Sequence, residues 1–224
     1  ADKLKSIFNN NREEYEKKWD DIKIVIEYGM LSEEKFFEKA DAFALYPTVD
    51  GKYYTFEELT NAIKAKQTDK DDKMVILYAA NKDEQHSYIE AAKEKGYEVL
   101  LLDSPIVSHL MQKLETSKEN ISFARVDADH IDNLIKKEDT KISKLSDEEK
   151  TKLDELLKEV VPSEKFMVQL EAMDSNAAPF MITQPEFMRR MKEMQQTGGG
   201  GMFGMGNMPE MYNLIVNTNH DLVG

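Results

Sequence analysis

Met74-Val75-Ile76-Leu77-Tyr78-Ala79, a continuous apolar run of strand length, decides the fold of this chain. A helical pattern from Asp83 to Lys95 follows it, and Gly96 leads into a second apolar run, Tyr97-Glu98-Val99-Leu100-Leu101-Leu102. Strands that helices cover on both faces are apolar throughout, and parallel strands need a helical connection between them. We therefore predict a βαβ unit over 74–102.

The alternation of helix and strand continues beyond this unit. A helical pattern runs from about Ile106 to Leu114, a short strand pattern covers Ile121–Val126, and a further helical pattern runs from His130 to Ile135. Such alternation is typical of a parallel sheet with helices on its faces. We predict a small three-layer α/β domain over 71–137.

Helices are predicted ahead of this domain, within 1–70. The first ends near Gly29 and the second ends before Pro47. The third begins at Thr55, whose hydroxyl forms a capping box with the carboxylate of Glu58. Their apolar positions recur at helical spacing: Tyr15, Trp19, Ile22 and Ile26 in the first, Phe36, Phe37, Ala40, Phe43 and Ala44 in the second, and Leu59, Ile63 and Ala65 in the third.

A second domain is predicted over 138–224. The polar segment Glu138–Ser143 is typical of a linker, and Ser146 with Glu149 forms another capping box, at the start of a helix that ends before Pro162. Two strand patterns follow: Phe166–Leu170 and Tyr212–Val216. These elements are too few for a complete domain. We therefore expect the sequence to be truncated at this end.

An amphipathic helix is predicted between these two strands, in Gln184-Pro185-Glu186-Phe187-Met188-Arg189-Arg190-Met191-Lys192-Glu193-Met194. Its apolar positions, at i, i+1, i+4 and i+7, are Phe187, Met188, Met191 and Met194, with Arg189, Arg190, Lys192 and Glu193 opposite. The predicted fold class is thus α+β or α/β: a helical segment, a three-layer α/β domain, and an α+β domain with a protruding amphipathic helix.

Glycine and methionine follow this helix, in Gly198–Gly201, Met202 and Phe203. Eight of the chain's 13 methionines fall between Met181 and Met211. Methionine is unbranched and polarizable, so it adapts to partners of many shapes. A glycine tether holds a buried helix in place poorly. We therefore predict a binding surface for other proteins at Phe187, Met188, Met191, Met194, Met202 and Phe203; the alternative is that the helix packs into its own domain.

Composition excludes several classes of function. The 224 residues carry 30 basic and 43 acidic side chains, a net charge of -13, which disfavours nucleic acid and anionic membrane as partners. No apolar run approaches the roughly 20 residues that cross a bilayer. Cysteine is absent, so neither disulfides nor thiol chemistry is expected, as is common in a reducing compartment. We expect a cytoplasmic protein.

Sites of chemistry are not evident in the sequence. The turn Ala79-Ala80-Asn81-Lys82-Asp83 has no glycine to cradle a phosphate. Asp127, Asp129, His130 and Asp132 partly resemble a calcium loop, but the expected glycine and glutamate are missing, so we predict no metal site. No nucleophile motif is present. The sequence therefore predicts no catalytic residue and no bound cofactor.

Four segments carry a resemblance to a known family. They are Trp19, the helix start Thr55-Phe56-Glu57-Glu58-Leu59, the segment Lys93-Glu94-Lys95-Gly96-Tyr97-Glu98-Val99-Leu100-Leu101-Leu102, and the closing Val216-Asn217-Thr218-Asn219-His220-Asp221-Leu222-Val223. In this order they resemble the 90-kilodalton heat-shock chaperone family in its bacterial form. The resemblance runs over nearly the whole chain.

This resemblance implies a domain assignment and a function. Residues 1–137 would be the distal part of the family's middle domain, and 138–224 most of its C-terminal domain. ATP and Mg²⁺ would bind in an N-terminal domain that this sequence lacks, so the chain itself would not hydrolyse ATP. The partners would be unfolded or partly folded client proteins, with a homodimer in the full-length parent. The amphipathic helix with Phe187, Met188, Met191 and Met194 would occupy the place of the family's client-binding helix. A tryptophan makes a second client contact in the family, and His109 stands at the matching position of this chain.

Two other functions remain open. A methionine-rich signal-sequence or peptide-binding module without ATP linkage would also mix glycine with methionine, but its RNA partner conflicts with the net charge of -13. An RNA gel shift would separate it from a chaperone. An α/β enzyme is the third interpretation, and it lacks both a phosphate cradle and a nucleophile.

Overall fold

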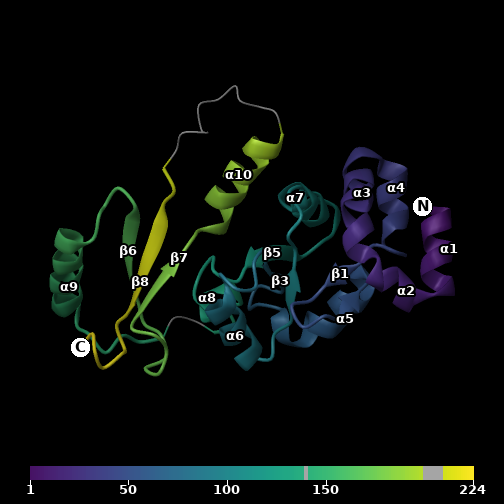
Figure 1. The fold of residues 1–224 in the computed structure, drawn as a ribbon. Helices are drawn as coiled ribbons and strands as arrows, with labels where there is room; N and C mark the ends of the chain where they lie inside the picture. The colour runs from purple at the N-terminus through teal and green to yellow at the C-terminus, as the bar shows by residue number, and fades with distance from the viewer. Residues whose placement is uncertain (139–140, 199–208) are drawn as a thin grey trace. The chain divides into compact units, whose positions relative to one another are not determined.

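The computed structural model describes residues 1–138, 141–198 and 209–224. Their contacts divide the chain into two compact units, Ala1–Val126 and Asp127–Gly224, and each is described by itself (Figure 1).

The division between the units falls earlier than the boundary predicted at 137/138. Asp127 already bonds within the second unit, because its carbonyl accepts a hydrogen bond from the Gln184 amide at 3.0 Å. Asp132 likewise forms an ion pair with Lys141 at 3.6 Å. The short helix α8 (Ile131–Leu134) therefore groups with the second unit, where the sequence pattern placed it in the α/β domain.

The first unit begins with helices and a small hairpin: α1 (Asp2–Asn10), α2 (Arg12–Lys17), α3 (Trp19–Ser32), α4 (Glu34–Ala40), β1 (Tyr46–Pro47), β2 (Tyr53–Tyr54) and α5 (Phe56–Gln67). The single first helix of the sequence prediction is two helices, because the Lys18 amide bonds the carbonyl of Tyr15, three residues back, and the chain turns. α3 then continues past Gly29.

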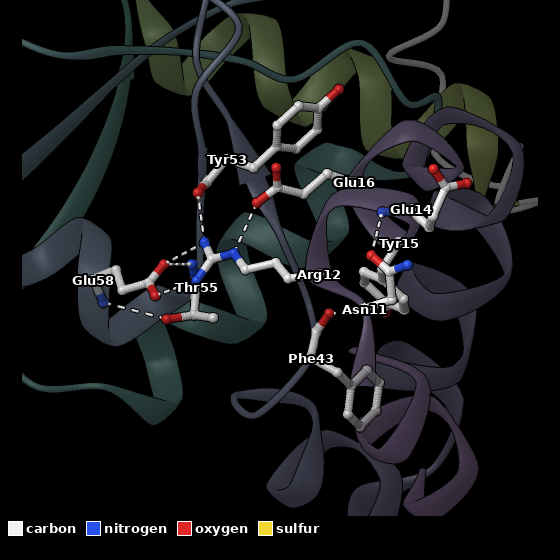
Figure 2. Close-up of polar contacts among 9 residues, drawn as sticks. All are labelled: Asn11, Arg12, Glu14, Tyr15, Glu16, Phe43, Tyr53, Thr55 and Glu58. Carbon is white, nitrogen blue, oxygen red and sulfur yellow. Dashed lines mark hydrogen bonds and ion pairs between the residues drawn. The ribbon is translucent and has the colours of Figure 1, made fainter. Parts of the chain in front are cut away.

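A partly exposed guanidinium contact joins two of these helices, as Figure 2 shows. Glu58 forms the predicted capping box with Thr55 at the start of α5. Its carboxylate also accepts hydrogen bonds from both terminal nitrogens of Arg12 on α2, at 2.5 and 2.8 Å. Arg12 donates further to the Tyr53 carbonyl and to Glu16. Glu58 therefore both caps α5 and links it to α2. No sequence pattern indicates this second contact.

A three-stranded parallel sheet forms the rest of the first unit: β3 (Met74–Ala79), β4 (Val99–Leu101) and β5 (Ile121–Arg125), in the order β4-β3-β5. The connecting helices are α6 (His86–Glu94) and α7 (Val107–Ser117). The chain moves from β3 outward to β4 and then back across to β5. Right-handed crossovers in opposite directions place the two helices on opposite faces, as Figure 1 shows. The predicted βαβ unit and three-layer arrangement are confirmed.

The core of this unit lies where the helices meet β3. Its residues Ile76, Leu77 and Tyr78 are each 1% exposed. Gln67, at the end of α5, is buried beside it: its side-chain nitrogen donates to the Val75 carbonyl at 2.9 Å, and its side-chain oxygen accepts from the Glu98 amide at 2.7 Å. Helix α5 is thereby attached to two neighbouring strand segments.

The second unit contains α8, α9 (Asp147–Val160), β6 (Phe166–Glu171), β7 (Phe180–Thr183), α10 (Glu186–Thr197) and β8 (Tyr212–Asn217). Its sheet has the order β6-β8-β7; β8 runs parallel to β6 and antiparallel to β7. The capping box of Ser146 and Glu149 is present at the start of α9. The predicted α+β arrangement is confirmed, with β7 as an additional strand.

Asn217, at the end of β8, organises the loops around this sheet. It is 0% exposed. Its side-chain oxygen accepts hydrogen bonds from the amides of Met173 and Asn219, each at 3.1 Å, and its side-chain nitrogen donates to the Asp174 carbonyl at 2.7 Å. A buried amide with all these bonds made holds one loop conformation.

Asn219 extends the same network to the segment that precedes α9. Its side-chain nitrogen donates to the carbonyls of Ile142 and Met173, at 3.1 and 3.0 Å, and its oxygen accepts from the Lys144 amide at 2.7 Å. The segment predicted to be a linker is thus bonded to the end of β8. The two asparagines therefore connect three separate parts of the second unit.

Replacing Asn217 by alanine tests this network. The change leaves the Met173 and Asn219 amides and the Asp174 carbonyl without their buried partner, so we expect the second unit to lose about 2–3 kcal/mol of stability. Amide hydrogen exchange of β8 measures the loss. Asn213→Ala on the same strand is the control, because the Asn213 side chain is only half-buried and outside the network. Equal protection in the two variants would contradict the role of Asn217.

Replacing Arg12 by methionine tests the contact between α2 and α5. Both partners are partly exposed, so we expect a loss of about 1 kcal/mol at neutral pH. Hydrogen bonds from Arg12 hold the pKa of Glu58 below its ordinary value of 4.5. A carboxyl whose pKa is lowered by folding stabilises the folded state at pH values above its ordinary pKa. This stabilisation is lost as the pH falls through the lowered pKa.

The difference in urea midpoint between wild type and Arg12→Met should therefore shrink on acidification from about pH 6 to about pH 3. Lys17→Met, which removes the exposed ion pair of Lys17 with Glu14, is the control and should change little at any pH. A difference for Arg12→Met that stays constant over this range would contradict the account.

Candidate functional site

Helix α10 forms where the sequence predicts it. Pro185 occupies the position just before the helix, with φ of −54° and ψ of 130°, and Glu186 lies in the first turn. An acidic side chain there interacts favourably with the helix dipole. The helix ends at Thr197, and Gly198 follows as its C-cap. The helix prediction is confirmed, with Pro185 capping the helix where the sequence pattern placed it in the first turn.

Arg189 is the buried residue of α10, contrary to the helical pattern, which set it on the solvent side. It is only 7% exposed. Its guanidinium forms ion pairs with Glu186 and Glu193, each at 2.7 Å. Arg190 pairs with the other carboxylate oxygen of Glu186, also at 2.7 Å. The charged side of the helix is therefore the side that is sheltered from solvent.

The apolar face of α10, namely Phe187, Met188, Met191 and Met194, is largely turned to solvent. Phe187 is 71% exposed, Met188 47% and Met191 37%, while Met194 is partly buried. Soluble proteins rarely expose a contiguous group of large apolar side chains without a partner for it. Four of the six predicted site residues thus lie together on one helix; Met202 and Phe203 lie outside the described residues.

A groove of about 60 Å³ lies between α10 and the segment that leads into β8. Met188 and Met191 line one side, and Pro209 and Met211 line the other. Across it, Lys192 and Glu210 form an ion pair at 2.8 Å, and Lys192 lowers the pKa of the Glu210 carboxyl. Sequence reasoning missed Met211 as a site residue, although it belongs to the same methionine-rich stretch.

Strand β7, which leads directly into α10, also exposes apolar side chains. Phe180 is 49% exposed and Ile182 47%. Phe180 is paired with Val216 and Ile182 with Leu214, so these residues share one face of the sheet. The short apolar run Phe180-Met181-Ile182 was the signal that could have revealed this strand. The apolar surface of the second unit therefore includes the sheet as well as the helix.

Side chains of the turn after β3 bond its backbone amides. The side-chain oxygen of Gln85 accepts hydrogen bonds from the amides of Ala80 and Asn81, and that of Asn81 accepts from Asp83 and Glu84. Phosphate binding at such a turn needs free backbone N–H groups. These four amides are already occupied by side chains of the same turn.

The acidic residues near α8 make contacts with neighbouring protein groups. His130 is buried, and its amide bonds the Asp129 carboxylate at 2.7 Å, whereas Asp132 pairs with Lys141. Within residues 1–138, 141–198 and 209–224, no three histidine, cysteine or acidic side chains come together as metal ligands would. His109, which stands where the family resemblance expects a tryptophan, lies partly buried on α7.

Curated proteins similar to this chain share one name. Chaperone protein htpG of Bacteroides fragilis is 50% identical over 226 aligned residues, and the Porphyromonas gingivalis protein HtpG is 43% identical; each alignment covers 100% of this chain and 33% of the relative. The HtpG of Bdellovibrio bacteriovorus is 26% identical over 76% of the chain. The chain belongs to the 90-kilodalton heat-shock chaperone family.

The chain spans about a third of the length of these HtpG relatives. No protein-family model matches it. Among solved structures, the middle domain of a Plasmodium falciparum heat shock protein resembles it with a TM-score of 0.43 and 16% identity, over 55% of this chain and 52% of that one. In the described part of the chain, no helix is both long and apolar enough to cross a membrane.

Residues in the segments that resemble the heat-shock family have structural roles in the folded chain. Trp19 is 2% exposed and packs near Tyr15. Thr55 caps α5. Gly96 has a φ of +73°, which favours glycine, and Asn217 holds the loops of the second unit. The family signature in this chain therefore specifies the fold, and the candidate binding surface on α10 lies outside it.

Replacing Arg189 by alanine tests how α10 is held. The change leaves Glu186 and Glu193 without a shared partner, so we expect the free energy of local opening of α10 to fall by about 2–3 kcal/mol. Hydrogen exchange of the α10 amides measures this. Lys192→Ala is the matched control on the same helix, because its ion pair with Glu210 is more exposed. If the α10 amides were as well protected from exchange in Arg189→Ala as in Lys192→Ala, Arg189 would not anchor the helix.

Proposed function

We propose that this chain binds partly folded polypeptides through the apolar face of α10, as the client-contacting part of an ATP-dependent chaperone. The observation that carries the proposal is the inverted orientation of the helix. Arg189 is sheltered between two carboxylates, and Phe187 and Met188 are exposed. A helix that served only to fill a core would have the opposite arrangement.

The chemistry of the surface supports unfolded chains as partners. An unfolded or partly folded protein exposes large apolar side chains, and burying one of them is worth about 1.5–3 kcal/mol. Methionine adapts its shape to different side chains, because it has three rotatable bonds and a polarizable sulfur. Membership of the heat-shock chaperone family supports the same partner class. The proposed function is therefore holding apolar segments of variable sequence.

Local charge supports a polypeptide partner over nucleic acid. The three basic residues of α10, Arg189, Arg190 and Lys192, are all engaged with carboxylates. Phosphate binding would need basic side chains that displace counterions from nucleic acid, and the chain as a whole carries a net charge of -13. An RNA-associated methionine-rich module is less well supported for this reason.

We further propose that ATP and Mg²⁺ act outside this chain, in another part of the parent protein. The occupied amides of the turn after β3 support this, since they leave no backbone cradle for phosphate. Family membership supports a homodimeric parent as well. The absence of cysteine suits a reducing, cytosolic location.

Replacing Met188 and Met191 together by serine tests the client surface. Both side chains are exposed, so the fold should be retained, whereas the variant should bind an unfolded client about 10- to 30-fold more weakly, because burial of two part-exposed methionines is worth about 2 kcal/mol. Titration with a fluorescently labelled, reduced and carboxymethylated protein measures the affinity.

Met167→Ser is the matched control for this experiment. Met167 is 56% exposed but lies on β6 of the same unit, away from α10. We expect it to bind the client like the wild type. If the double serine variant and this control bound the client with equal affinity, the assignment of α10 as the client-binding element would be contradicted.

A further inference from the structure

A narrow cavity lies inside the first unit, between α3, the hairpin strand β1 and the start of α7. It has about 20 Å³ of free space. Most of its wall is apolar, formed by Trp19, Met30, Leu45, Val107, Leu110 and Met111. A space of this size holds one water-sized molecule, since a water needs about 10–15 Å³. All the residues that line the cavity belong to the first unit.

Two buried polar side chains also line this cavity. Glu27, on α3, is 7% exposed, and Tyr46, on β1, is 3% exposed. The Glu27 oxygen Oε2 and the Tyr46 hydroxyl have no hydrogen-bond partner among the described protein atoms. The Ser104 side chain lies close enough to Glu27 to oppose the rise that burial causes in the pKa of this carboxyl. Buried polar atoms in folded proteins are nearly always paired, by protein or by ordered water.

One basic and two acidic side chains lie near Glu27. Lys23, one turn earlier on α3, forms ion pairs with Asp103 at 2.6 Å and with Asp20 at 3.0 Å. Lys23 lowers the pKa of Glu27 and Asp103 raises it, while burial, the largest influence, also raises it. Lys23 is already paired, so the small volume and mostly apolar wall of the cavity favour a guest that is small and uncharged.

We propose that this cavity is a binding site for one structural water molecule, which bridges Glu27 Oε2 and the Tyr46 hydroxyl. Water can donate to the carboxyl oxygen and exchange a second hydrogen bond with the phenol, so it satisfies both atoms at once. The bridge joins the helical part of the first unit, through α3, to the hairpin strand β1. Its role is to fix how α3 lies against this hairpin.

Counting long-lived internal waters in the full chain tests the proposal. Oxygen-17 magnetic relaxation dispersion measures their number, and Tyr46→Phe should remove one, because the water loses one of its two side-chain partners. Tyr53→Phe is the control: this hydroxyl lies on β2, outside the residues that line the cavity, so the number should stay at the wild-type value. Glu27→Gln keeps a hydrogen-bonding oxygen there and should also retain the water.

Stability provides a second reading of the same variant. If the Tyr46 hydroxyl bonds a water, Tyr46→Phe should lower the urea midpoint; if the hydroxyl has no partner at all, its removal should raise the midpoint. Should Tyr46→Phe fail to fold, Glu27→Met, which fills the cavity with an apolar side chain, replaces it in the water count. An unchanged number of long-lived waters in these variants would overturn the proposal.

Discussion

The paired guanidinium of Arg189 is the interaction on which the proposed binding surface depends. A helix near a domain surface ordinarily buries its apolar side, because that burial is worth several kcal/mol. In α10 the charged side is sheltered, since Arg189 lies between Glu186 and Glu193 at 2.7 Å from each. The two carboxylates satisfy a cation that would otherwise have to face water. Phe187 and Met188 are left exposed as a consequence.

The surface also needs a frame that holds the two ends of the inserted segment. β7 leads into α10 and β8 receives the chain again, and the two strands pair antiparallel. Asn217, at the end of β8, and Asn219 beyond it fasten this pair to neighbouring loops through buried side-chain amides. The family signature thus builds the frame, while the adaptable methionines lie between its strands. This division suits the proposed role of α10, in which a rigid frame carries a surface that adapts to its partner.

Local patterns in the sequence predicted the elements whose causes are local. Helix α5 and its capping box are specified within a few residues of Thr55, and the β3 run is apolar because helices cover both faces of its sheet. Contacts between distant residues were not predictable. Arg12 and Glu58 are 46 residues apart, and the burial of Arg189 contradicts the helical periodicity around it. Periodicity shows which residues share a face, but tertiary contacts determine where that face points.

The central claim is that the apolar face of α10 is open to solvent until a client covers it. Methionine methyl NMR with a soluble paramagnetic agent tests this directly. The account predicts strong relaxation of the Met188 and Met191 methyls and weak relaxation of Met30 and Met111, which are each 1% exposed. An added unfolded client should then protect Met188 and Met191 but leave Met167 on β6 exposed. Protection of these two methyls in the free chain would contradict the account.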